Sequence, residues 1–160
     1  GRYGEGVASM RAKKNRRFGP PTFLTQAGLS IGFQAGAEAV DLVLLVMTKR
    51  GLKSLLKDEL TLGADAAVSA GPIGRHAEAA IDIGMQGEIY SYSRSKGAFA
   101  GVSLKGTVIS TDKKANHAYY GQFLKAKDIL IRNKVKNIPK SGKRFIKELN
   151  FLAQPLNKRK

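Results

Sequence analysis

The residues best suited to chemistry in this chain are cations that stand beside glycines. Arg94 and Lys96 precede Gly97 in the segment YSYSRSKGAFAGVSLKG, which runs from Tyr90 to Gly106. Arginine binds phosphate through paired hydrogen bonds, lysine adds a point charge, and glycine-rich turns leave backbone amides open to an anion. A second such turn, Gly71-Pro-Ile-Gly74, precedes Arg75. The anion-binding candidates in these turns or elsewhere in the Tyr90–Gly106 segment are Arg75, Arg94, Lys96 and Lys105. For Arg75 and Arg94, an internal salt bridge that fixes the loop is an equal alternative.

Residues that commonly support catalysis or metal binding do not form a recognisable pattern. The chain has no cysteine, and His76 and His117 lie in unrelated segments without a ligand spacing around them. There is no Gly-x-Ser-x-Gly elbow, and the glycines of Gly1–Gly6 lack the rest of a dinucleotide fingerprint. We therefore predict a protein that is not an enzyme and uses no cofactor or metal.

The charge is large and unevenly distributed. The net charge is +16, from 28 lysines and arginines against 12 acids. Residues 1–17 hold six cations against one acid, and residues 121–160 hold twelve against two. Such a surface attracts acidic lipid, nucleic acid or acidic protein, and charge alone does not choose among them.

The elements that must position these groups are mostly strands. Tyr90, Tyr92 and Arg94 alternate with serines, and similar alternation recurs along the chain, as in strands with one buried face. Residues 40–47 form the longest apolar run, which is too short to cross a bilayer and is predicted to be the most buried strand. The fold class predicted is α+β: β-rich, with a curled antiparallel sheet or barrel-like core and short helices at its edges.

Helices are predicted at four places. Thr48 is expected to cap a helix over 49–57, and Asp112 to cap a turn after it. Residues 123–132 have helical propensity, and Ser141 is expected to cap a last helix that ends at Ala153. The apolar face of that last helix is expected to dock on the domain, or alternatively to lie on a membrane. In both cases Lys143, Arg144 and Lys147 lie outside this apolar face and can contact lipid headgroups. Residues 154–160 are expected to form a basic frayed tail.

Five motifs follow one another along the chain: Phe18-Gly-Pro-Pro-Thr-Phe23, Ser30–Gly36 with Asp41–Leu45, Thr61–Arg75, Tyr90–Gly106 and Asn116-His-Ala-Tyr-Tyr-Gly121. In this order they resemble the SYLF lipid-binding domains. Together they cover about residues 1–150. One departure is Phe18, where the family usually has tryptophan. Family members also carry further residues before the segment that starts here, so a single SYLF-like domain over 1–160, truncated at its N-terminus and prone to self-association, is expected.

The resemblance implies a non-enzymatic module that recognises acidic phospholipids or phosphoinositides at a membrane surface. A structural or protein-interaction scaffold, for actin or for cell-envelope assembly, is the alternative. Nucleic-acid binding through Tyr90–Lys96 is a third, disfavoured because no nucleic-acid motif accompanies it. Because no second module is present in the chain, the resemblance favours a protein of the bacterial envelope or periplasm, with the cytoplasmic face of a membrane as the other location.

Overall fold

The computed structural model describes residues 2–28, 41–74, 77, 87–95, 98–101 and 104–159. The chain divides into two compact units. Unit 1 comprises Gly1–Tyr3 and Gln26–Ile109, and unit 2 comprises Gly4–Thr25 and Ser110–Lys160. Arg75 and Lys96, two of the predicted anion-binding residues, lie outside the described residues.

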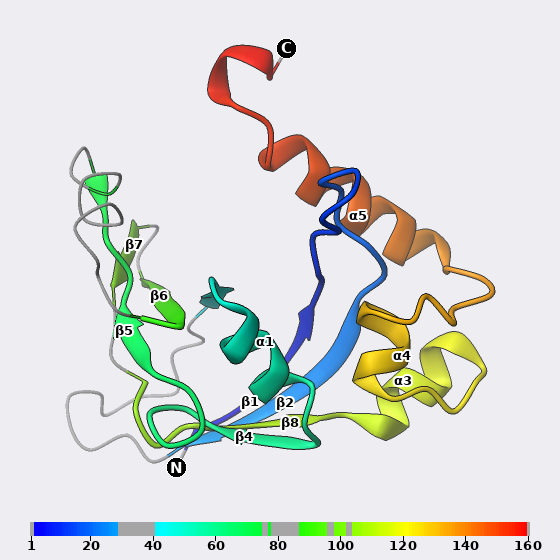
Figure 1. Cartoon of the computed structure of the whole chain (residues 1–160), viewed down its shortest axis with the longest axis horizontal. Helices are drawn as coiled ribbons and strands as arrows, with labels where there is room; N and C mark the ends of the chain where they lie inside the picture. Colours follow the sequence, from blue (N-terminus) through cyan, green and yellow to red (C-terminus); the bar gives the residue numbers. More distant parts are fainter. Residues whose placement is uncertain are drawn as a thin grey trace. The chain divides into compact units, whose positions relative to one another are not determined.

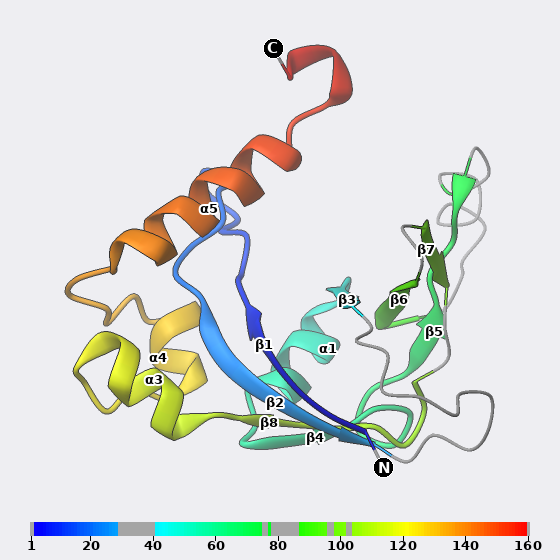
Figure 2. The ribbon, with the colours of Figure 1, turned by 180° about the vertical axis from the view of Figure 1, so that it is seen from behind.

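The described strands form two sheets. The first has the order β1-β2-β8-β4, and the second has the order β3-β6-β5, with β7 also paired to β6. Neither order closes on itself among the described strands, and β2 is visibly curved in Figures 1 and 2. The predicted α+β fold with curled sheets is therefore confirmed, with open sheets in place of the barrel. The strands are β1 (Arg2–Ala8), β2 (Thr22–Gly28), β3 (Asp41–Val46), β4 (Glu59–Thr61), β5 (Val68–Ala70), β6 (Ile89–Ser95), β7 (Ala98–Gly101) and β8 (Val108–Thr111).

The second sheet is built around β6. It pairs antiparallel with β3 along one edge, parallel with β5 at its start and antiparallel with β7 at its end. The register places Tyr90 opposite Leu45 and Arg94 opposite Asp41. Since cross-strand partners point to the same face, Asp41, Val43 and Leu45 share a face with the alternating tyrosines and arginine of β6.

The prediction that residues 40–47 form the most buried strand is wrong. Along β3 the side chains alternate between half-buried and exposed, and Val43 and Leu45 are 40% and 45% exposed. Within the described residues, β3 pairs only with β6 and so forms an edge of its sheet. An apolar run identifies a strand, but an edge strand covered on one face buries only every second side chain.

The helices follow local capping rules closely. The Oγ1 of Thr48 accepts the backbone N–H of Gly51 at 3.0 Å, and Asp112 accepts that of Ala115 at 2.9 Å, so both predicted caps are confirmed. Gly121 ends its helix in the left-handed region, with φ of +66°. The described helices are α1 (Lys49–Leu55), α3 (Lys113–Tyr120), α4 (Ala126–Leu130), α5 (Lys140–Leu152) and the 3₁₀ helix η2 (Leu156–Lys158).

Two helix predictions need correction. The helix expected over 123–132 is only the short α4, which begins after Lys125 where Asp128 accepts the N-cap backbone N–H at 3.1 Å. The last helix begins after Pro139, and the Ser141 hydroxyl bonds the Tyr119 hydroxyl at 2.7 Å instead of capping. Pro139 is the N-cap residue and has no hydroxyl, so this helix start has no side-chain cap, and the serine makes a tertiary contact.

Candidate functional site

The tyrosines of β6 are fixed by glycines of neighbouring segments. A Cβ atom at Gly71 would overlap the Tyr92 ring, and one at Gly101 would lie 2.6 Å from the Gly71 carbonyl oxygen. The Tyr92 hydroxyl donates to the Pro72 carbonyl at 2.9 Å. Burial, and to a smaller degree the neighbouring Tyr90, raises the pKa of Tyr92 above its ordinary value. The tyrosine-glycine pattern of this segment is thus a packing arrangement that holds β5, β6 and β7 together.

Arg94 forms an ion pair across the sheet. Its Nε and Nη2 atoms lie 3.0 Å and 2.5 Å from Asp41 Oδ2, as the β3–β6 register requires. The side chains are 48% and 60% exposed, so solvent still reaches both charges. The internal salt bridge that was the alternative to anion binding at Arg94 is therefore present. Any anion that binds there competes with the carboxylate of Asp41.

Lys105 lies in a tight turn that follows the buried Leu104. Gly106 has φ of +84°, its N–H donates to the Leu62 carbonyl at 2.8 Å, and the Thr107 N–H donates to the Leu104 carbonyl at 3.1 Å. The side chain of Lys105 crosses Gly63, where an added Cβ would lie 3.2 Å from its Cγ. The turn is fixed by backbone bonds, and the residue is exposed.

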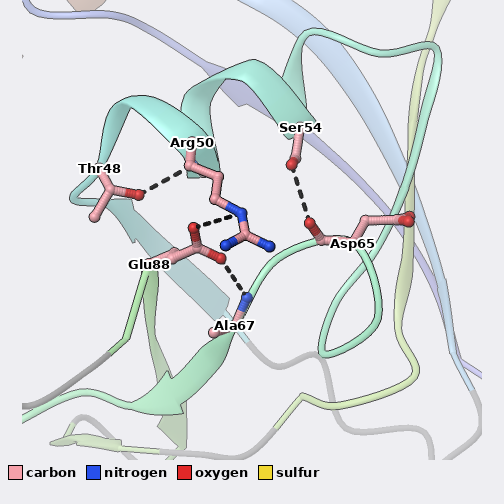
Figure 3. A network of polar contacts seen from close by, with 7 residues as sticks. Thr48, Arg50, Ser54, Asp65, Ala67 and Glu88 are labelled. Carbon is pink, nitrogen blue, oxygen red and sulfur yellow. Dashed lines mark hydrogen bonds and ion pairs between the residues drawn. The ribbon is translucent and has the colours of Figure 1, made fainter.

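A polar network around α1 joins three segments of unit 1 (Figure 3). One oxygen of Glu88 accepts the Ala67 N–H at 2.8 Å, and the other lies 3.4 Å from Arg50 Nε. The Ser54 hydroxyl donates to the Asp65 carbonyl at 3.1 Å. Arg50 is 82% exposed and its partner Glu88 only 17%, so the network serves chiefly to satisfy backbone groups. Within the described residues, no three His, Asp or Glu side chains gather in a way that could hold a metal ion.

Helix α5 separates apolar and basic side chains as expected from its sequence. Phe145, Ile146 and Leu149 are half-buried, which agrees with a docked apolar face, whereas Lys143, Arg144 and Lys147 are exposed. Lys140 lies one turn before Lys143 and Arg144, and it is exposed as well. These four residues, the α5 cations, make no ion pair among the described residues. Lys140 was not among the predicted site residues. The sequence could have identified it, because the other three cations follow it by three, four and seven residues, the spacing of one helix face.

The α5 cations are followed by exposed apolar side chains. Phe151 is 41% exposed, Leu152 is 54% exposed and Leu156, in η2, is 80% exposed. Beyond them Arg159 donates from Nε to the Gln154 carbonyl at 2.9 Å and from Nη2 to the Leu152 carbonyl. The end of α5 thus places apolar groups next to a basic face.

The motif at residues 116–121 is architectural. Asn116 is fully buried; its side chain accepts the Phe23 N–H at 2.8 Å and donates to the Thr22 hydroxyl at 3.1 Å. The Tyr120 hydroxyl donates to the Pro21 carbonyl, and burial raises the Tyr120 pKa well above its ordinary range, with a smaller contribution from Tyr119. The Pro-Pro segment is thereby fastened to α3 within unit 2.

Comparison with known proteins agrees with this arrangement of motifs. The sequence profile described as "Las17-binding protein actin regulator" (Ysc84) matches residues 27–151. The chain belongs to this family. The resemblance to SYLF domains drawn from the motifs is thus confirmed.

The relatives are longer proteins. LAS seventeen-binding protein 3 of Saccharomyces cerevisiae is 40% identical over 133 residues, which cover 81% of this chain and 29% of that protein. Protein YSC84 of the same yeast is 38% identical over 133 residues, 81% of this chain and 28% of that protein. The SH3 domain-containing YSC84-like protein 1 of Xenopus laevis is 36% identical over 122 residues, 76% of this chain and 36% of that protein. No solved structure matches the chain.

These relatives bear on the predicted location. They come from a yeast and a vertebrate, so they give no support to the preference for a bacterial envelope protein. None of the helices that the structure describes has the length and apolar character needed to span a bilayer.

Proposed function

We propose that the chain is a non-enzymatic module that binds acidic phospholipids at a membrane surface. The observation that carries the proposal is the basic face of α5, which ends in the exposed side chains of Phe151, Leu152 and Leu156. A bilayer interface accepts both groups at once: anionic headgroups attract the cations, and the acyl boundary receives the apolar side chains. Each lysine or arginine near an anionic leaflet contributes about 1 kcal/mol at low salt.

The turn residues are proposed to refine this binding. Arg75, Arg94, Lys96 and Lys105 belong to the motif segments, and an arginine can distinguish headgroups by the geometry of its paired hydrogen bonds as well as by charge. Lys105 is exposed on a rigid turn, whereas Arg94 must exchange its bond to Asp41 for one to phosphate. We therefore expect Lys105 to contribute more to affinity for a phosphoinositide than Arg94 does.

Vesicle flotation tests the proposal. The chain should float with phosphatidylcholine vesicles that contain phosphatidylserine or a phosphoinositide, and not with phosphatidylcholine alone, and high salt should release it. The triple variant Lys143→Gln/Arg144→Gln/Lys147→Gln should bind anionic vesicles on the order of 100-fold more weakly, since each lost cation is worth about fivefold.

The structure offers a control of equal charge. Lys49, Lys53 and Lys57 are exposed on or just after α1, and none makes an ion pair among the described residues. Changing all three to glutamine removes the same charge from a different unit. Equal weakening by both triple variants would mean that bulk charge alone drives binding, and equal flotation with neutral and anionic vesicles would refute lipid recognition.

A protein-interaction role in actin regulation is the second candidate. It is supported by the description of the matched family and by the name of the yeast relative as a LAS seventeen-binding protein. The chain spans about a third or less of the length of these relatives, so segments outside it can provide that interaction in them. Sedimentation of the chain with actin filaments in the absence of lipid, compared with flotation, separates the two functions.

A further inference from the structure

We infer that a basic hairpin near the N-terminus of the chain forms one continuous lipid-binding surface with α5. The hairpin comprises residues 9–19, and its cations Arg11, Lys13, Lys14, Arg16 and Arg17 are all exposed. This inference rests on the proposed function and adds a second segment of the chain to the same lipid-binding surface. The family match begins after the hairpin, at residue 27, and the motifs include only its last two residues, Phe18 and Gly19.

The hairpin and α5 belong to the same unit and are in direct contact. The backbone N–H of Phe18 donates to Asn150 Oδ1 at 2.8 Å, across 132 residues of sequence. The hairpin (blue) lies beside α5 (orange) in both Figure 1 and Figure 2. At 100° per residue, Asn150 lies only about 20° around the helix from Lys143 and about 10 Å further along its axis. The hairpin is therefore attached at the edge of the cationic face of α5, next to Lys143, because Ile146 of the apolar face lies about 40° from Asn150 on the other side and Arg144 about 120° away.

The hairpin is held by internal hydrogen bonds in the absence of any partner. Backbone bonds join Ala12 to Arg17 at 2.8 Å and Gly19 to Met10 at 3.0 Å. Arg11 donates from Nε to the Arg16 carbonyl at 2.7 Å, which braces the turn. A preorganised turn loses little further conformational freedom on binding, so more of the electrostatic attraction contributes to affinity.

Arg16 has a left-handed backbone conformation, which arginine seldom adopts. Its φ of +55° lies in the left-handed region, where glycine and asparagine are favoured and a long side chain is disfavoured. A cation held in that conformation at the tip of an exposed turn is consistent with a binding role for the turn.

An anionic bilayer is the partner that best fits the combined surface. Two basic segments from opposite ends of the sequence meet in unit 2, with the exposed Phe151 and Leu152 on the same helix. A bilayer presents both a continuous sheet of negative charge and an apolar layer beneath it. Nucleic acid or an acidic protein would use the cations, but neither offers a comparable apolar layer to Leu156.

Flotation with phosphatidylcholine vesicles containing phosphatidylserine tests the inference. The hairpin variant Lys14→Gln/Arg16→Asn/Arg17→Gln removes three charges and places asparagine where the backbone is left-handed. It should weaken binding on the order of 100-fold, as the α5 triple variant does, and more than the α1 control Lys49→Gln/Lys53→Gln/Lys57→Gln. Asn150→Ala keeps the net charge but removes the attachment, and it should weaken binding severalfold. Melting temperatures identify any variant that has lost its fold.

The outcomes separate the two proposals. If the unmodified chain does not float with anionic vesicles, the proposed function fails. If it floats and the α5 variant weakens binding, but the hairpin variant only matches the α1 control, the hairpin is not part of the surface and this inference fails alone. Stronger hairpin-dependent binding to single-stranded DNA or actin filaments than to the vesicles would also overturn it.

Discussion

The tyrosine-rich strand β6 and the basic surface of unit 2 use polar residues in opposite ways. Around β6, the Tyr92 hydroxyl, the Arg94 guanidinium and the Glu88 carboxylate all have partners within the protein. On α5, the four cations are exposed to solvent and make no ion pair among the described residues. The contrast suggests that the motifs by which the family is recognised chiefly maintain the fold, while residues outside the most distinctive motifs are available for partners.

The same contrast exists within unit 2. Asn116 and Tyr120 of the closing motif are buried and bonded to the backbone of residues 21–23, yet Lys114 of the same helix is exposed. Removing a buried bonded group leaves its partner unsatisfied, whereas the surroundings of an exposed cation can be filled by water. Variants of the two kinds should therefore differ in what they damage: stability in the first case and binding in the second.

The largest expected effect is at Gly71. Replacing it with alanine places a methyl group inside the Tyr92 ring, so the strand or the ring must move, and we expect a loss of about 3 kcal/mol in the free energy of unfolding. Gly6→Ala is the matched control, because nothing lies within 4 Å of an added Cβ there. Urea denaturation measures both. Since Tyr92→Ala removes the obstruction, the double variant should cost less than the sum of the two single changes.

A smaller loss is expected at Asn116. Asn116→Ala leaves the Phe23 N–H and the Thr22 hydroxyl without their partner in a fully buried site, which should cost about 2 kcal/mol. Asn137→Ala, at an exposed position, is the control and should be neutral. Thermal melting compares them. If Asn116→Ala melts with the unmodified chain, the closing motif is not structural and its role must be sought in binding.

The smallest effect is expected at Asp128, and it should depend on pH. The backbone N–H of Lys125, helped by Arg132 and Lys134 and opposed by burial, holds the pKa of Asp128 below its ordinary value. A lowered folded-state pKa means that the ionised group stabilises the fold above about pH 4 and loses this effect as pH falls further. Asp128→Asn should therefore cost about 1 kcal/mol at neutral pH and progressively less below pH ~4.

Denaturation of the Asp128→Asn variant across this pH range provides the check. A constant difference between the variant and the unmodified chain would mean that the carboxylate acts by shape and not by charge. The expected result would mean that Asp128, like Gly71 and Asn116, maintains the fold, although it lies in the basic C-terminal region.

Much of the local structure could be read from the sequence. Thr48 and Asp112 were identifiable as caps because a cap is a contact across three residues, and the alternation in β6 was visible because strand periodicity is local. The basic face of α5 followed from helical spacing for the same reason. The positions of short helices such as α4 were less predictable, since tertiary packing outweighs weak helical propensity.

The sequence by itself determined that this chain has two basic ends, a strand with alternating tyrosines, turns that contain glycine, and the motifs of its family. Only the tertiary structure decided which of these meet. Asp41 pairs with Arg94 across 53 residues, and Phe18 bonds Asn150 across 132. No local pattern encodes such pairs, because strand register and helix docking are set by the combined packing of distant segments. For that reason the cations can be read from the sequence, while the fold decides that Arg94 is held by a carboxylate and that the hairpin is joined to α5.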